Sequence, residues 1–145
     1  MDHSLKLINV DRLQVEEVLF TSHKVPTCLD SSLESTLLSG HEDAIVRLWD
    51  VRSGALAKTF KTQFEGHEKW ISQVRFNYSV ENVFLSASYD GTVRLWDLRN
   101  EEAPIASMKR KEQAEDYKVF ALEWNGPSQI LSGGSDSHIS VHTIG

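Results

Sequence analysis

The sequence predicts an all-β fold built from repeated units, and three observations support this. Residues 38–52 align with residues 85–99, with nine identical positions out of fifteen. The aspartates at the centre of this motif and of two shorter copies, Asp2, Asp43, Asp90 and Asp136, are separated by 41, 47 and 46 residues. Within the motif Val93 and Leu95 alternate with their neighbours at a period of two, which suits a pleated strand and not a helix.

Each repeat contains short β-type segments separated by polar turns. In the unit from residue 66 we expect strands at 70–76, 82–86, 92–96 and 104–108, here called strands a, b, c and d, with Tyr89-Asp90-Gly91 as the b–c turn. No segment of the chain has a convincing helical pattern. The sequence thus predicts four-stranded antiparallel sheets.

A repeat length in the forties with a Trp-Asp dipeptide is typical of β-propeller blades. Residues 1–21 are expected to form strands c and d of a preceding blade, 22–65 and 66–113 two complete blades, and 114–145 a last blade with three strands. The expected total is thirteen strands, which make about three blades plus two strands. That number of blades is too small for a closed ring. We therefore expect that Met1 follows a truncation within a blade, and that the isolated chain self-associates or needs the rest of its propeller.

Composition excludes several classes of protein. Fifteen basic and 21 acidic side chains give a net charge of −6, which opposes binding to a nucleic-acid backbone. Apolar runs are much shorter than the roughly 20 residues that span a bilayer, and no leader segment is evident. Cys28 is the single cysteine, so no internal disulfide can form.

From Gly66-His67 through Trp96-Asp97, and again at Trp49-Asp50, the chain resembles the WD40 family of β-propellers. Within that family, residues 2–10, residues 67–74 and a last blade with Leu131-Ser-Gly-Gly but no Trp-Asp resemble the WD-repeat ribosome-biogenesis factors that act with Pescadillo in the PeBoW complex. The resemblance implies a partial WD40 propeller that is not an enzyme. The resemblance further implies a protein-binding scaffold in large ribosomal subunit assembly and rRNA processing, which would associate with pre-ribosomes. The expected location is the nucleus, in particular the nucleolus, with the cytoplasm as the alternative.

The resemblance also implies a structural hydrogen-bond network in each blade. In the unit from residue 66 its members would be His67, Ser86, Asp90 and Trp96. The preceding unit keeps Ser39, Asp43 and Trp49, with His23 as a candidate fourth member. The last unit has Glu115 and His142 in place of His and Trp, so we expect its network to be missing.

Several motifs offer alternatives from other classes. Ser86, His67 and Asp90 contain the residue types of a serine hydrolase triad. Arg52 and Arg99 complete two Trp-Asp-x-Arg motifs, whose spelling resembles substrate receptors of cullin-4 ubiquitin ligases.

A resident metal or cofactor is not expected. His138 and His142 on one strand would lie about 13 Å apart, too far to share a metal ion. Gly133-Gly134 has no following Lys for a phosphate loop, and instead suggests close blade packing or a bulge.

The resemblance implies that partners bind where the a strands start and the b–c turns lie. The residues at these positions are Lys69, Trp70, Glu42, Tyr89, Tyr117, Lys118 and Ser135. Trp70 and Tyr89 are the strongest candidates, since large amphipathic rings dominate interaction hot spots. The alternative for Trp70 is burial between blades.

Overall fold

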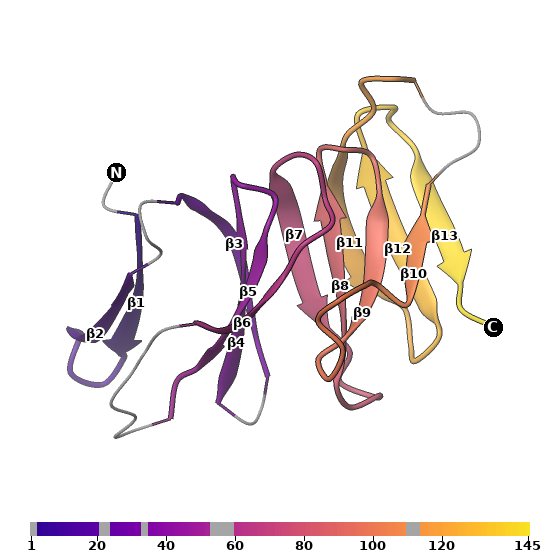
Figure 1. Ribbon diagram of the computed structural model, residues 1–145. Helices are drawn as coiled ribbons and strands as arrows, with labels where there is room; N and C mark the ends of the chain where they lie inside the picture. The colour runs from indigo at the N-terminus through magenta and orange to yellow at the C-terminus, as the bar shows by residue number, and fades with distance from the viewer. Residues whose placement is uncertain (1–2, 21–23, 33–34, 53–59, 110–113) are drawn as a thin grey trace.

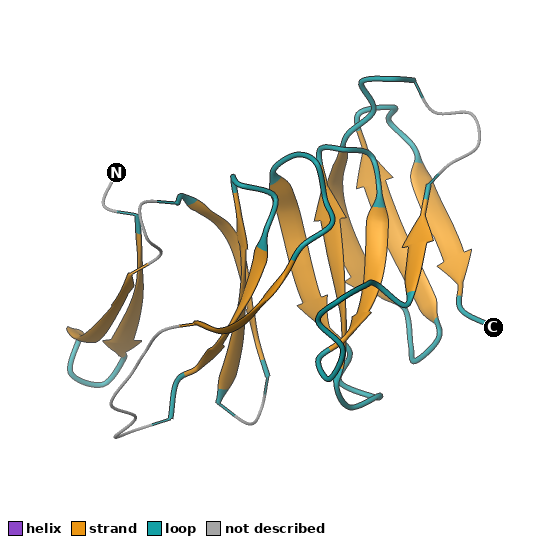
Figure 2. Cartoon of the chain, in the orientation of Figure 1, coloured by secondary structure: helices purple, strands orange, loops and turns teal. Residues whose placement is uncertain are grey.

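The computed structural model describes residues 3–20, 24–32, 35–52, 60–109 and 114–145. These residues form thirteen β-strands in four antiparallel sheets, with no helix among them. The sheets stand side by side in chain order, from the N-terminus to the C-terminus (Figure 1), and loops make up the rest of the described chain (Figure 2). The predicted fold class, an all-β partial propeller, is confirmed.

Each sheet is one blade, numbered here in chain order. The first blade contains β1 (Ser4–Asn9) and β2 (Gln14–Phe20), and the second β3 (Pro26–Ser31), β4 (Thr36–His41), β5 (Val46–Asp50) and β6 (Phe60–Phe64). The third contains β7 (Ile71–Phe76), β8 (Val83–Ser88), β9 (Val93–Asp97) and β10 (Ala106–Met108), and the fourth β11 (Val119–Trp124), β12 (Gln129–Gly134) and β13 (Ile139–Thr143). In the third blade the sequence predicted strand b to end at residue 86, and β8 continues to Ser88.

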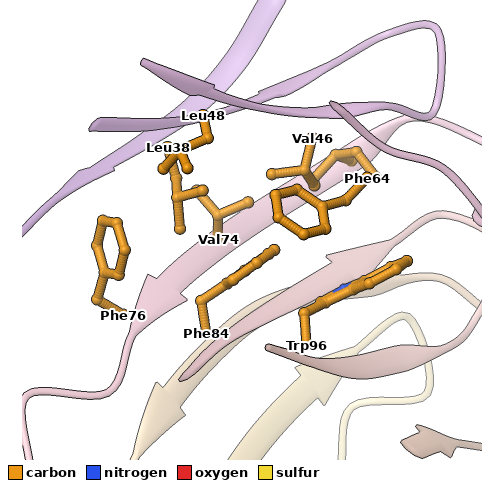
Figure 3. Packing of buried hydrophobic residues seen from close by; sticks show 9 residues of the cluster. Leu38, Val46, Leu48, Phe64, Val74, Phe76, Phe84 and Trp96 are labelled. Carbon is orange, nitrogen blue, oxygen red and sulfur yellow. The ribbon is translucent and has the colours of Figure 1, made fainter. Parts of the chain in front are cut away.

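The main core lies between the second and third blades. Figure 3 shows Leu38, Val46 and Phe64 of the second blade facing Phe84 and Trp96 of the third. The Phe64 ring meets the Phe84 and Trp96 rings edge-on, with centroids 4.8 and 5.6 Å away. This cluster removes large aromatic and branched side chains from water, which is the main stabilising contribution in such a fold.

Smaller clusters join the remaining blades. Trp49 of the second blade packs with Leu5 of the first, just as Trp96 of the third blade packs against the second. The third and fourth blades share a cluster that includes Leu85, Leu95 and Leu122. The Trp of each Trp-Asp pair therefore faces the preceding blade.

Side chains on the innermost strands link neighbouring blades through backbone groups. Asp30 Oδ2 on β3 accepts a hydrogen bond from the Phe76 amide on β7 at 2.7 Å. Gln73 Oε1 on β7 accepts one from the Leu122 amide on β11 at 2.8 Å. The links fix the blades relative to each other, and hence align their b–c turns along one rim.

Candidate interaction site

Four side chains of the third blade form a continuous hydrogen-bonded chain. Trp96 Nε1 donates to Ser86 Oγ at 2.8 Å, and Ser86 Oγ lies 2.7 Å from His67 Nε2. His67 Nδ1 lies 2.8 Å from Asp90 Oδ2. The structure thus brings together all four residues that the family resemblance assigned to a network.

The protonation state of His67 follows from this arrangement. If Nδ1 carries the proton, it donates to Asp90, while the Ser86 hydroxyl accepts from Trp96 and donates to Nε2, so each group is satisfied. Burial lowers the pKa of His67 from its ordinary value, despite the opposing effect of Asp90. Burial raises the pKa of Asp90, but hydrogen bonds from His67 and Thr92 outweigh it and hold the pKa well below its usual range. Neutral His67 and ionised Asp90 are the consistent pair.

The same geometry argues against a hydrolase site. Ser86 is fully buried between strands, and its Oγ contacts both Trp96 and His67. A nucleophile must approach a substrate carbonyl at about 3–3.5 Å, which this side chain cannot do without unfolding the sheet.

The second blade builds its network differently. Trp49 Nε1 donates to Ser39 Oγ at 2.7 Å, and the His contact to Ser39 comes from His41 Nε2, also at 2.7 Å. Asp43 instead forms a two-pronged ion pair with Arg47. The candidate His23 lies outside the described residues. His41 and Ser39 are two apart on β4 and so share a face, a signal that the sequence contained.

The fourth blade keeps one contact of the network. Ser132 Oγ lies 3.0 Å from His142 Nε2, so His142 meets the serine at the place where the other blades have Trp. The expectation that the fourth blade lacks the network is therefore wrong for the contact between Ser132 and His142.

The b–c turns and a-strand starts meet in the same way in three blades. In each blade the amide that follows strand b donates to the carbonyl just before strand a: Glu42 to Val25 at 3.1 Å, Tyr89 to Trp70 at 3.0 Å and Ser135 to Lys118 at 2.9 Å. These bonds give equivalent residues the same place in each of the three blades.

An open pocket of about 600 Å³ lies on this rim. It is lined by Glu42, Asp43, Ala44, Glu68, Lys69, Trp70, Tyr89 and Lys118, which come from the second, third and fourth blades. Five of the seven residues predicted to bind partners are among them: Glu42, Lys69, Trp70, Tyr89 and Lys118.

Aromatic rings form the wall of the pocket. Trp70 is 52% exposed, so the alternative of burial between blades does not apply. Its ring is nearly parallel to that of Tyr89, at 18° and a centroid distance of 6.3 Å. Lys118 Nζ lies 5.6 Å from the centre of the Tyr89 ring, and Phe120 meets that ring edge-on. Sequence reasoning missed the half-exposed Phe120, since the alternation along β11 does not say which side stays uncovered.

The other two predicted residues lie elsewhere. Tyr117 is only 4% exposed and packs in the cluster between the third and fourth blades, so it reaches only the floor of an adjoining hollow and offers little surface to a partner. A Cβ atom at Gly134 would lie 2.5 Å from the Tyr117 hydroxyl, so the glycine provides the space for this ring. Ser135 is exposed in an adjoining hollow of about 270 Å³ together with Lys118 and Phe120.

The remaining motifs form local pairs. Arg52 and Arg99 fold back onto Asp50 and Asp97, the aspartates of their own Trp-Asp pairs. His138 lies beside Asp136 in the β12–β13 turn. Within the described ranges, no three His, Cys, Asp or Glu side chains are grouped as metal ligands. No helix in those ranges is long and apolar enough to cross a membrane.

Comparison with known proteins agrees with this architecture. The WD domain, G-beta repeat family matches residues 15–50 and 58–97, more than half of the chain. Ribosome biogenesis protein WDR12 homologs are similar to nearly the whole chain: 33% identical in Dictyostelium discoideum, covering 98% of this chain and 32% of that protein, and 36% identical in Oryza sativa, covering 97% and 31%. The homolog of Anopheles gambiae is 34% identical, covering 97% and 32%.

The chain spans about a third of the length of these relatives. The similarities confirm the resemblance to WD-repeat ribosome-biogenesis factors, and the tandem matches, the four-stranded blades and the buried Trp-Ser-His-Asp network together establish that the chain belongs to the WD40 repeat family.

Proposed function

We propose that the chain is a non-catalytic scaffold of a nuclear, nucleolar ribosome-assembly complex, acting in large ribosomal subunit assembly and rRNA processing. The similarity of almost the whole chain to ribosome biogenesis proteins carries this proposal. Its partners would be Pescadillo-type assembly factors, with association with pre-ribosomes.

The rim pocket is the proposed contact surface. It combines a half-exposed Trp70, a Tyr89 ring held by its neighbours, and charged side chains around them. A rigid aromatic anchor with a charged border is the usual composition of a protein-binding hot spot. The cullin-4 receptor hypothesis has weaker support, because Arg52 and Arg99 pair with their own Trp-Asp aspartates.

Affinity capture from a eukaryotic extract tests the proposal. The chain should recover Pescadillo-type factors, and Trp70→Ala or Tyr89→Ala should weaken that binding by roughly 1–4 kcal/mol with little loss of folding stability. Glu101→Gln, at an exposed position away from the rim, is the matched control. Recovery of the cullin-4 adaptor in place of those factors would favour the ligase alternative. Unfolding by Trp70→Ala would assign that residue to the core.

A further inference from the structure

The rim pocket has opposite charges at its two ends. On the second-blade side, Asp43 is neutralised by its ion pair with Arg47, which leaves the charge of Glu42. In the middle, Glu68 and Lys69 are neighbours of opposite sign beside Trp70 and Tyr89. On the fourth-blade side the charged side chain is Lys118. The lining is thus acidic at one end and basic at the other, with two aromatic rings and one pair of opposite charges between them.

The backbone holds these groups in place. Glu42 Oε1 accepts a hydrogen bond from the Val25 amide. The Trp70 and Lys118 carbonyls accept from the Tyr89 and Ser135 amides of the b–c turns, and the Lys118 amide donates to Ser135 Oγ. A pocket whose groups are already ordered loses little entropy when it binds a ligand. The Glu42 carboxylate and the backbone on both sides of the rings are therefore held in place, and Lys118 Nζ lies over the Tyr89 ring.

We propose that this pocket binds an extended peptide segment in one direction. A basic side chain of the peptide lies at Glu42, an apolar or aromatic side chain packs on Trp70 and Tyr89, and an acidic side chain lies at Lys118. Complementary charges at the two ends fix the polarity of the segment, while the rings supply most of the buried apolar area. The proposal rests on the rim being the contact surface, and it adds the chemistry of the partner.

Single-stranded RNA is the competing occupant, because Trp70 and Lys118 could stack and neutralise a nucleotide. The carboxylates of Glu42 and Glu68 at the pocket, together with a net charge of −6, disfavour a phosphate backbone. A peptide that offers both signs of charge fits better.

Selection from a random peptide library displayed on phage tests the proposal without any ribosomal factor. The wild-type chain should enrich peptides in which a basic and an acidic residue flank an apolar one. Lys118→Glu should weaken binding of the selected peptides by about tenfold or more, and exchanging the acidic peptide residue for Lys should restore it. Glu42→Gln, which retains the acceptor for the Val25 amide, should weaken selection for the basic residue.

Exposed Glu101→Gln and Lys109→Glu serve as matched controls and should bind like the wild type. Circular dichroism of each variant separates loss of binding from loss of fold. The proposal is overturned if no such peptides are enriched, if Lys118→Glu behaves like Lys109→Glu, or if a polyuridine oligonucleotide binds the pocket and displaces the peptides. Peptide selection that succeeds while capture of assembly factors fails would refute the proposed function alone.

Discussion

At the scale of single residues, Ser86 shows how a buried polar group determines the position of two strands and a loop. Its hydroxyl connects Trp96 on β9 with His67 in the segment before β7. In a low-dielectric interior, each member depends on the others, since an unpaired buried donor costs about 1–3 kcal/mol.

Ser86→Ala removes the central member of this network. We expect the free energy of unfolding to fall by about 0.5–3 kcal/mol, because Trp96 and His67 lose a partner inside the sheet. Urea unfolding measures the effect, with the exposed Ser107→Ala as the control. Neither the wild-type chain nor the Ser86→Ala variant should hydrolyse any of a panel of ester substrates. Turnover that disappears in a folded Ser86→Ala variant would mean that the network is catalytic.

His41 predicts a specific dependence of stability on pH. Burial, aided by the Arg47 charge, lowers the pKa of His41 to about 4, whereas an unfolded His titrates near 6.5. Between these values the unfolded chain binds a proton that the folded chain does not, so stability falls as the pH falls from about 6.5 to about 4. The His41 contribution to this loss should approach about 3 kcal/mol.

Urea unfolding at pH 7 and at pH 4.5 measures this loss. His41→Gln can still hydrogen-bond Ser39 but does not titrate, so its stability should fall less over this range. Equal losses in the wild-type and variant chains would contradict the assignment.

The resemblance to the WD40 family could predict the network of the third blade but not that of the second. The motif of the third blade spells out every member, with His67 just before strand a. In the second blade the contact to Ser39 comes from His41, and a repeat alignment looks for His in the wrong segment. The burial of Tyr117 was equally hidden, because it depends on the space beside Gly134 and not on the residue type.

At the scale of strands, the start of β11 must approach the end of β12 closely. The register between these strands shifts between Val119 and Ala121, opposite Gly134 and Gly133. A Cβ atom at Gly134 would lie 2.2 Å from the Lys118 carbonyl oxygen, whereas a Cβ atom at Gly133 would lie 3.9 Å from its nearest neighbour, the His138 carbonyl oxygen. The sequence suggested close blade packing or a bulge for this pair. The structure has the register shift of a bulge opposite the two glycines, and the close approach at Gly134 is to residues of the same blade. The sequence could not say at which of the two positions a side chain would clash.

The two glycines form a matched pair for a test. Gly134→Ala should destabilise the chain by about 1–3 kcal/mol, since backbone and the Tyr117 ring must move to accept the methyl group. At Gly133 an added methyl group would make only an ordinary van der Waals contact, so Gly133→Ala should cost clearly less. Thermal unfolding of the two variants compares them directly, and equal destabilisation would show that steric crowding at Gly134 is not the reason for the glycine.

At the scale of the whole molecule, the middle and outer blades differ in how well their sheets are covered. β8 of the third blade is buried on both faces, because blades pack on either side of it. On the fourth blade, Ile139 and Val141 are 78% and 60% exposed, and no described strand pairs with the outer edge of β13. On the first blade, the cross-strand neighbours Ile8 and Val15 are also exposed.

These surfaces predict that the 145-residue chain self-associates. Exposed apolar faces and unpaired strand edges gain free energy when another copy covers them. Light scattering after size exclusion at micromolar concentration should therefore report a species larger than 16.4 kDa. Replacing both Ile139 and Val141 with Lys should shift the chain toward the monomer, since the charges oppose burial of that face, whereas the same replacement of exposed Ser107 should not. A wild-type chain that is strictly monomeric and unfolds cooperatively would show that the uncovered faces of the first and fourth blades are stable in water.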